Sequence, residues 1–79
     1  ADARALWAVR VLDRWLSNPG RAVELDGSDQ SGVFKIKCWA WLDGKRERVS
    51  AHYGATPDAA RIAAAEALVA EDPTLGESL

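Results

Sequence analysis

Two tryptophans and several cationic side chains occupy alternate positions in one short stretch of this chain. In the segment 33–42, an extended strand would place Lys35, Lys37, Trp39 and Trp41 on the same side. Indole rings beside Lys or Arg can anchor a protein interface, or can stack on nucleobases while the cations hold phosphates. This part of the sequence therefore predicts a binding surface, although it does not name a ligand.

The dipeptide Asp43-Gly44 follows this segment, and it is a strong signal for a two-residue type I′ turn between antiparallel strands. Counting back from that turn gives the register of a hairpin over 33–53. One face carries the pairs Trp41 with Arg46, Trp39 with Arg48, Lys37 with Ser50 and Lys35 with His52. The other face carries the pairs Cys38 with Val49, Ile36 with Ala51 and Phe34 with Tyr53, and we expect it to face the core.

The candidate binding residues all lie on the predicted tryptophan face: Trp39, Trp41, Arg46, Arg48, Lys35, Lys37 and His52. One interpretation is structural, with arginines lying across the indoles in cation–π pairs worth roughly 0.5 to 1 kcal/mol each. A second is a protein interface, and a third is a site for single-stranded nucleic acid. We favour the protein interface, because a net charge of −2 opposes the steering of nucleic acid toward the chain.

Residue types that could perform catalysis or bind a metal are sparse. His52 is the only histidine, and no acid is placed to complete a triad with it and Ser50. Cys38 is the only cysteine, on the predicted core face, and so we expect a small buried hydrophobe in a reducing cytoplasm. We therefore expect no enzymatic activity, no metal and no cofactor.

Charge is distributed unevenly along the 79 residues. The hairpin carries five Lys or Arg against two acids, whereas the segment 54–79 carries one Arg against five acids. Proteins that hold duplex nucleic acid usually carry an overall basic footprint, which this chain lacks.

No apolar run approaches the length of a membrane span. We expect a protein partner or a homodimer, with nucleic acid as the second choice and no membrane contact.

Helices are expected on both sides of the strands. Residues 2–17 have helical periodicity, with Asp2 as the cap and the segment 18–20 as the stop signal. A short strand over 21–26 would bring two acids, Glu24 and Asp26, beside the two lysines of the tryptophan face.

The last helix begins at Thr56-Pro57-Asp58, with Thr56 as N-cap and Pro57 at the first helical position. It ends at 71–73. We expect a single domain over 1–73 followed by a flexible tail over 74–79. The fold class is α+β: an α-β-β-β-α two-layer sandwich in which a three-stranded antiparallel meander has both helices on one face.

This order of elements resembles a double-stranded RNA-binding domain. In the segment 56–65, the residues that match the last-helix signature of that family are Thr56, Ala60, Arg61 and the alanines 63–65. Two lysines of the signature, which would grip phosphates, are replaced by Pro57 and Asp58. The resemblance therefore implies the fold, while the replacements remove the main RNA contact and add repulsion.

The chain is also similar to small phage-encoded α/β sandwich proteins. Like them, it ends in a Thr-Pro-initiated, alanine-rich helix after tryptophan-bearing strands. That similarity implies an accessory or inhibitory protein of phage type.

Overall fold

A computed structural model describes residues 2–27 and 31–79, with the elements in the order helix, three strands, helix. The elements are α1 (Ala3–Leu16), β1 (Ala22–Asp26), β2 (Phe34–Leu42), β3 (Lys45–Gly54), α2 (Pro57–Glu71) and the short 3-10 helix η1 (Pro73–Gly76). The predicted α+β class and the α-β-β-β-α order are confirmed. Residues 1 and 28–30 lie outside the described part of the chain.

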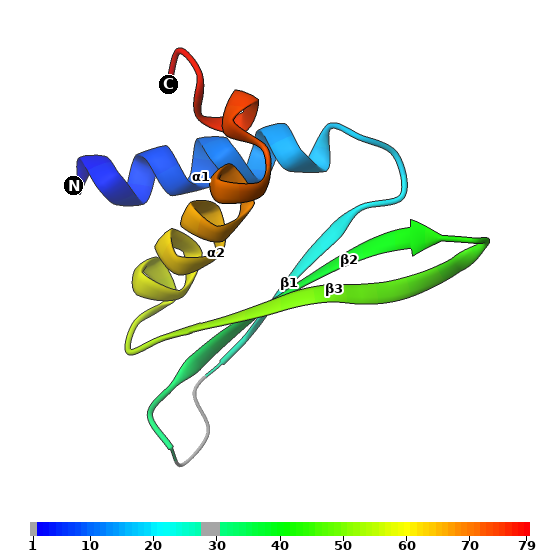
Figure 1. Ribbon diagram of the computed structural model, residues 1–79. Helices are drawn as coiled ribbons and strands as arrows, with labels where there is room; N and C mark the ends of the chain where they lie inside the picture. The colour runs from blue at the N-terminus through cyan, green and yellow to red at the C-terminus, as the bar shows by residue number, and fades with distance from the viewer. Residues whose placement is uncertain (1, 28–30) are drawn as a thin grey trace.

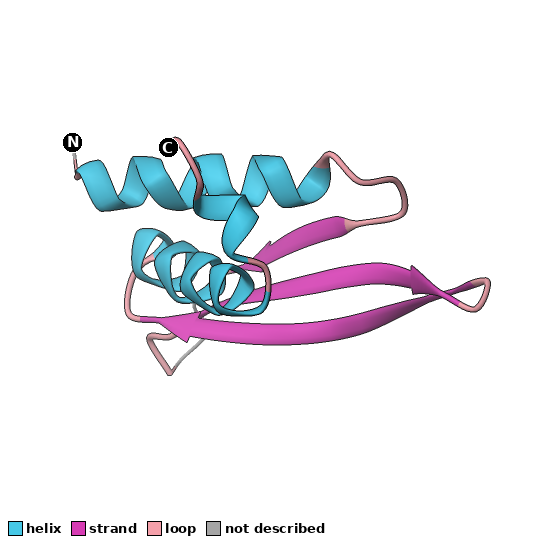
Figure 2. Cartoon of the chain, turned by 45° about the horizontal axis from the view of Figure 1, so that its top comes forward, coloured by secondary structure: helices cyan, strands magenta, loops and turns pink. Residues whose placement is uncertain are grey.

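The strands form one antiparallel sheet in the order β1-β2-β3, and both helices lie on the same side of it (Figure 1). α2 packs directly on β2 and β3, whereas α1 packs mainly on α2 and reaches the sheet at β1 (Figure 2). The hairpin of β2 and β3 extends beyond the ends of both helices. Its far end therefore projects as an arm, and the opposite side of the whole sheet is left without a covering layer.

Local sequence signals fix the helix starts and the hairpin turn. The Asp2 carboxylate accepts a hydrogen bond from the Arg4 amide (2.9 Å), and the Thr56 hydroxyl accepts one from the Ala59 amide (3.0 Å). Asp43 and Gly44 both have positive φ, at 52° and 80°, as a type I′ turn requires. Both predicted caps and the predicted turn are confirmed.

The core lies between the sheet and the helices. Its buried residues come from both helices, β2 and η1: Ala8, Val11, Leu12, Trp15, Ile36, Cys38, Ala60, Ala64, Ala65, Leu68 and Leu75. Three of the α2 residues are fully buried alanines, so the backbone of this helix can approach the sheet closely.

The register of the hairpin changes halfway along it, at a β-bulge beside Trp39. From the turn to the pair Trp39 with Arg48, the predicted register is confirmed. Beyond that pair β3 contains one extra residue, so the predicted pairs are wrong. The observed pairs are Cys38 with Ser50, Lys37 with Ala51, Ile36 with His52, Lys35 with Tyr53 and Phe34 with Gly54.

Because of the bulge, the β3 residues that follow it face the side of the sheet opposite to the predicted one. Ser50 and His52, predicted on the tryptophan face, lie on the helix side opposite buried residues of β2. Tyr53, predicted in the core, is 56% exposed, and Ala51 now pairs with a lysine. Val49, also predicted in the core, is the extra residue of the bulge and is 45% exposed on the helix side. These placements correct the sequence analysis.

Packing at the start of α2 gives the bulge a physical reason. In an uninterrupted register Tyr53 would lie opposite Phe34, on the helix side. The structure places Gly54 there, and even a Cβ atom on this glycine would overlap the backbone of Ala59 and Ala60. A tyrosine could not occupy this position, whereas one extra residue brings the glycine under the helix.

The segment after α2 packs against the domain. Leu75 of η1 is buried, and the Arg14 guanidinium donates hydrogen bonds to the carbonyl oxygens of Thr74 (3.1 Å) and Glu77 (2.6 Å). The sequence predicts a flexible tail over 74–79, but Leu75 belongs to the core. The mobility of the last residues stays a prediction.

Candidate functional site

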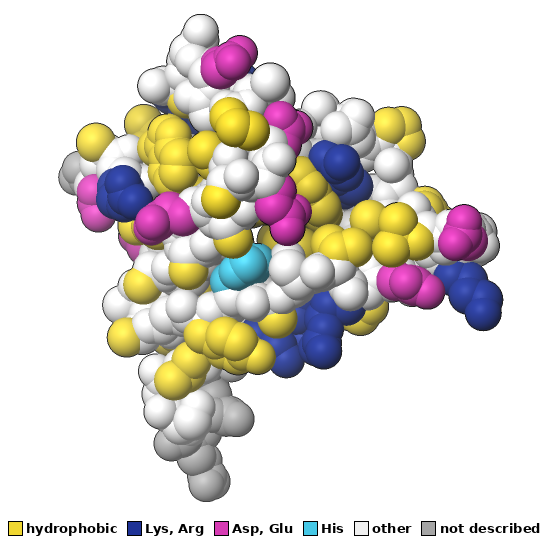
Figure 3. Space-filling model, viewed as in Figure 1, with side chains coloured by type: hydrophobic (Ala, Val, Ile, Leu, Met, Phe, Trp, Pro, Cys, Tyr) yellow, Lys and Arg dark blue, Asp and Glu magenta, His cyan; other side chains and the backbone are white. Residues whose placement is uncertain are grey.

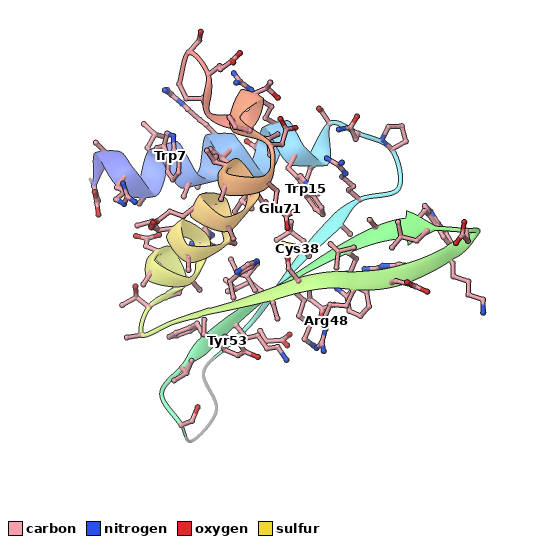
Figure 4. The ribbon with its side chains drawn as sticks, viewed as in Figure 1. Trp7, Trp15, Cys38, Arg48, Tyr53 and Glu71 are labelled. Carbon is pink, nitrogen blue, oxygen red and sulfur yellow. The ribbon has the colours of Figure 1, made fainter. Side chains whose placement is uncertain are left out.

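The side of the sheet that faces away from the helices carries two tryptophans on β2. Trp41 is 59% exposed, and Trp39 is half-buried. Their partners across the strand pair are Arg46 and Arg48, as predicted. In Figure 4, Arg48 and Tyr53 lie on this side of the hairpin, whereas Cys38 lies on the helix side. We call the uncovered side of the sheet the open face.

The two indoles have different surroundings. The Arg46 guanidinium lies over the Trp39 ring, 5.1 Å from its centroid, as a diagonal cation–π contact. Trp41 instead lies against Gly20: its amide donates to the Gly20 carbonyl (3.1 Å), and a Cβ atom on this glycine would overlap the indole. The loop after α1 therefore supports the back of Trp41 and leaves much of the ring in solvent.

One of the two lysines of the open face is compensated by acids, and the other lies beside an aromatic ring. The Lys37 ammonium pairs with Asp26 (2.8 Å) and Glu24 (3.3 Å), which confirms the predicted neighbourhood of β1 acids and β2 lysines. The hydrogen bond with Lys37 lowers the pKa of Asp26, and the hydrogen bond with Asp26 raises the pKa of Lys37. The Lys35 ammonium lies 5.7 Å from the centroid of the Tyr53 ring.

Uncompensated positive charge remains at the tryptophan end. Among residues 2–27 and 31–79, neither Arg46 nor Arg48 forms an ion pair. The indole nitrogen of Trp39 is enclosed and donates to no described residue. This end of the open face therefore combines an exposed aromatic ring, two arginines and an unused donor.

Ser50 and His52 belong to a different site on the helix side. The His52 Nε2 and the Ser50 hydroxyl are 2.9 Å apart. Both residues line a cavity of about 280 Å³ between the projecting hairpin and the C-terminal ends of α1 and α2. The other lining residues are Trp15, Arg21, Ala40, Leu42, Val49, Ala67, Leu68 and Glu71. Figure 3 shows the histidine at the edge of this hollow, among apolar, acidic and basic side chains.

This cavity was not predicted from the sequence, which indicated a continuous core in this region. Neither Arg21 nor Glu71 was predicted as a site residue. No local signal marks them, because they lie 50 positions apart in the sequence and meet only through the packing of α1, α2 and the sheet.

The cavity does not contain a catalytic triad. Although Ser50 and His52 form the first two members of such an arrangement, no hydrogen bond joins His52 to Glu71. Cys38 is buried and free as predicted, and burial raises the pKa of its thiol, which disfavours the thiolate. Within the described residues, no three His, Cys, Asp or Glu side chains are grouped so that they could hold a metal ion.

The imidazole of His52 should make folding depend on pH. Burial lowers its pKa below the ordinary 6.5, and the carboxylate of Glu71 opposes this in part. The unfolded state therefore takes up a proton near pH 6.5 while the folded state stays neutral, so stability falls as the pH drops through that value.

We expect the free energy of unfolding to decline as the pH drops from about 7.5 through 6.5, and His52→Gln to flatten that decline. Urea denaturation of both proteins across this range measures the effect. Equal slopes for the two proteins would contradict the assignment of the titration to His52.

Comparison with known proteins leaves the family of this chain open. No protein-family model, curated protein or solved structure matches it. In the described part of the chain, neither helix is both long and apolar enough to cross a membrane.

Proposed function

We propose that this chain is a non-catalytic binding domain that contacts another protein through the tryptophan end of its open face. The observation that carries the proposal is the 59% exposure of Trp41 on a sheet side that no helix covers. Beside it lie two arginines that form no ion pair with any residue the structure describes. Tryptophan and arginine are the residues most enriched among those that dominate binding energy at protein interfaces.

Several features of this end favour an interface over a merely solvated surface. Loop support behind Trp41 reduces the entropy that the ring would lose on binding. The Arg46 guanidinium lies over the Trp39 ring and would place its charge at the edge of such an interface. Burial of both rings would remove a large apolar area from water.

The charge of the open face indicates the kind of partner. A symmetric dimer whose two-fold axis passed through the tryptophan end would bring Arg46 and Arg48 close to their own copies, which is repulsive. An acidic rim on the partner would instead complement these arginines. A second copy could supply such a rim only through another surface, such as its acidic segment 54–79. We therefore favour a different protein with an acidic contact surface, with self-association as an outcome of the test.

Nucleic acid is the alternative ligand, because stacked bases also use exposed indoles flanked by cations. Two observations weigh against it. The chain has a net charge of −2, and Lys37 is already paired with two acids. Where the RNA-binding family carries its second lysine, Asp58 instead pairs with Arg61 (3.3 Å). An accessory role of phage type remains the biological setting that the sequence similarity implies.

Removal of the indoles should abolish binding without unfolding the domain. We expect Trp41→Ala to cost about 2 kcal/mol or more, a roughly thirtyfold loss of affinity, and Trp39→Ala with Trp41→Ala to abolish detectable binding. The measurement is titration of a purified protein that the wild-type chain captures from cell extract, or sedimentation equilibrium if the chain associates with itself.

Leu6→Ala is the matched control, since Leu6 is an exposed apolar residue on α1, away from the open face. It should bind as the wild type does. Undiminished binding by the folded double variant would refute the proposal.

Duplex RNA should bind weakly or not at all at physiological salt, because an acid and a proline replace the two phosphate-binding lysines. A gel-shift titration with a duplex longer than about 16 base pairs covers the span that such domains contact. Tight binding that survives added salt would restore the RNA-binding interpretation.

A further inference from the structure

We propose that the cavity between the hairpin and the ends of α1 and α2 binds a small zwitterion with an apolar body, of the class of the free apolar α-amino acids. The cavity lies on the helix side of the sheet, so this site is separate from the open face and goes beyond the proposed function.

The shape of the fold creates the cavity. The hairpin extends past the helices, so the helix-side residues near its tip are only partly covered (Figure 1). The walls are formed by apolar side chains of both helices and the sheet, among them Trp15 of α1, Leu68 of α2 and Leu42 of β2. A volume of about 280 Å³ lies just below the usual range for drug-sized ligands, roughly 300 to 1,000 Å³. The cavity therefore suits a molecule of amino-acid size.

Arg21 offers a fixed cationic group. Its guanidinium lies over the Trp15 ring, 4.8 Å from the centroid, and one of its N–H groups donates to the Trp15 carbonyl (3.1 Å). It forms no ion pair within residues 2–27 and 31–79. A guanidinium that is held by stacking keeps its remaining donors available, and their planar geometry matches a carboxylate.

Glu71 offers the opposite charge at the same cavity. The side chain comes from the last residue of α2 and lines the cavity while exposed to solvent, below Trp15 in Figure 4. Its carboxylate has no ion pair or hydrogen bond with any described residue. Arg21 and Glu71 thus line one cavity with opposite charges and remain more than an ion-pair distance apart. A ligand that carries both charges can bridge them.

The β-bulge supplies polar groups without adding charge. In an uninterrupted register Ala51 would face the helices here, whereas the bulge turns Ser50 and His52 inward, and Val49 lines the same cavity. Bulges are frequent beside binding sites, where they redirect side chains. Because burial lowers the pKa of His52, the ring is neutral at pH 7 and can exchange hydrogen bonds with Ser50 or a ligand.

These features together select the ligand class. A carboxylate would bind at Arg21, an ammonium group at Glu71, and an aliphatic side chain against Trp15, Leu42 and Leu68. A carboxylic acid or an amine alone would satisfy one charge only. A polypeptide terminus likewise offers one of the two groups, so the free amino acid is the complete match.

Calorimetric titration with L-leucine, N-acetyl-L-leucine and L-leucine amide tests the proposal on the wild-type chain. We expect L-leucine to bind and each blocked derivative to bind at least about tenfold more weakly, because each lacks one charge. Arg21→Gln and Glu71→Gln should weaken L-leucine binding by a similar factor. In Arg21→Gln, L-leucine and its amide should bind alike, because the carboxylate has lost its partner.

Arg10→Gln and Glu47→Gln are matched controls, since both residues are exposed and have no ion pair in the described part of the chain. They should bind L-leucine as the wild type does. The proposal is overturned if L-leucine shows no binding tighter than about 1 mM, or if the blocked derivatives bind equally well. If Arg21→Gln does not fold, the three ligands on the wild-type chain still decide the question.

Discussion

Ile36→Ala will lower the free energy of unfolding by about 2 to 5 kcal/mol, which is a large share of the stability of so small a domain. Ile36 has no exposed surface and lies on the central strand, between β1 and β3 and beneath the helices. Its truncation removes apolar contacts and leaves a cavity that surrounding strands and helices can fill only in part.

Urea denaturation measures this loss, with the wild type and the variant fitted to the same dependence of unfolding free energy on urea concentration. Val33→Ala is the control, because Val33 precedes β2 and is 40% exposed, so its change should be much smaller, within about 1 kcal/mol. Similar losses for the two variants would show that Ile36 is not at the centre of the core.

Gly54→Ala will destabilise the domain by about 1 to 3 kcal/mol, although it adds a single methyl group. The new Cβ atom would overlap the backbone of Ala59 and Ala60, which cannot move aside as a flexible side chain could. Either α2 shifts away from the sheet or the strand distorts, and both outcomes loosen the core beneath the first turn of the helix.

Gly27→Ala is the matched control, since nothing lies within 4 Å of a Cβ atom at that position. Its free energy of unfolding should stay close to that of the wild type or rise slightly, because alanine restricts the unfolded chain. A neutral Gly54→Ala would contradict the reason given for the bulge.

The sequence predicted the parts of the fold that depend on local chemistry. The Asp43-Gly44 turn fixed the hairpin register as far as Trp39, because a two-residue turn leaves one way to pair the strands next to it. Asp2 and Thr56 marked the helix starts, since their side chains satisfy amides that have no partner within a helix.

The register beyond Trp39 could not be predicted in this way. Local alternation in β3 allows Ala51 or His52 to face the helices. What decides between them is the close approach of α2 to Gly54, which is a tertiary contact. One extra residue then moved His52 to the opposite side of the sheet.

The two candidate sites differ in the same way in how far the sequence could predict them. The tryptophan end of the open face lies near the turn, before the bulge, and its four central residues were predicted in their observed pairing. The cavity combines residues from four elements and follows from how far the hairpin extends past the helices. Residue spacing in the sequence carries no signal for such an arrangement.

Indole N–H resonances of the ¹⁵N-labelled chain provide the most direct test of the open face as the protein-binding surface. The four tryptophans report on three places: Trp7 on α1, Trp15 at the cavity, and Trp39 and Trp41 on the open face. On titration with the captured partner, or on concentration if the chain binds itself, the resonances of Trp39 and Trp41 should shift while those of Trp7 and Trp15 stay in place. Shifts confined to Trp7 or Trp15 would contradict the account, as would shifts of Trp39 and Trp41 that only a single-stranded oligonucleotide produces.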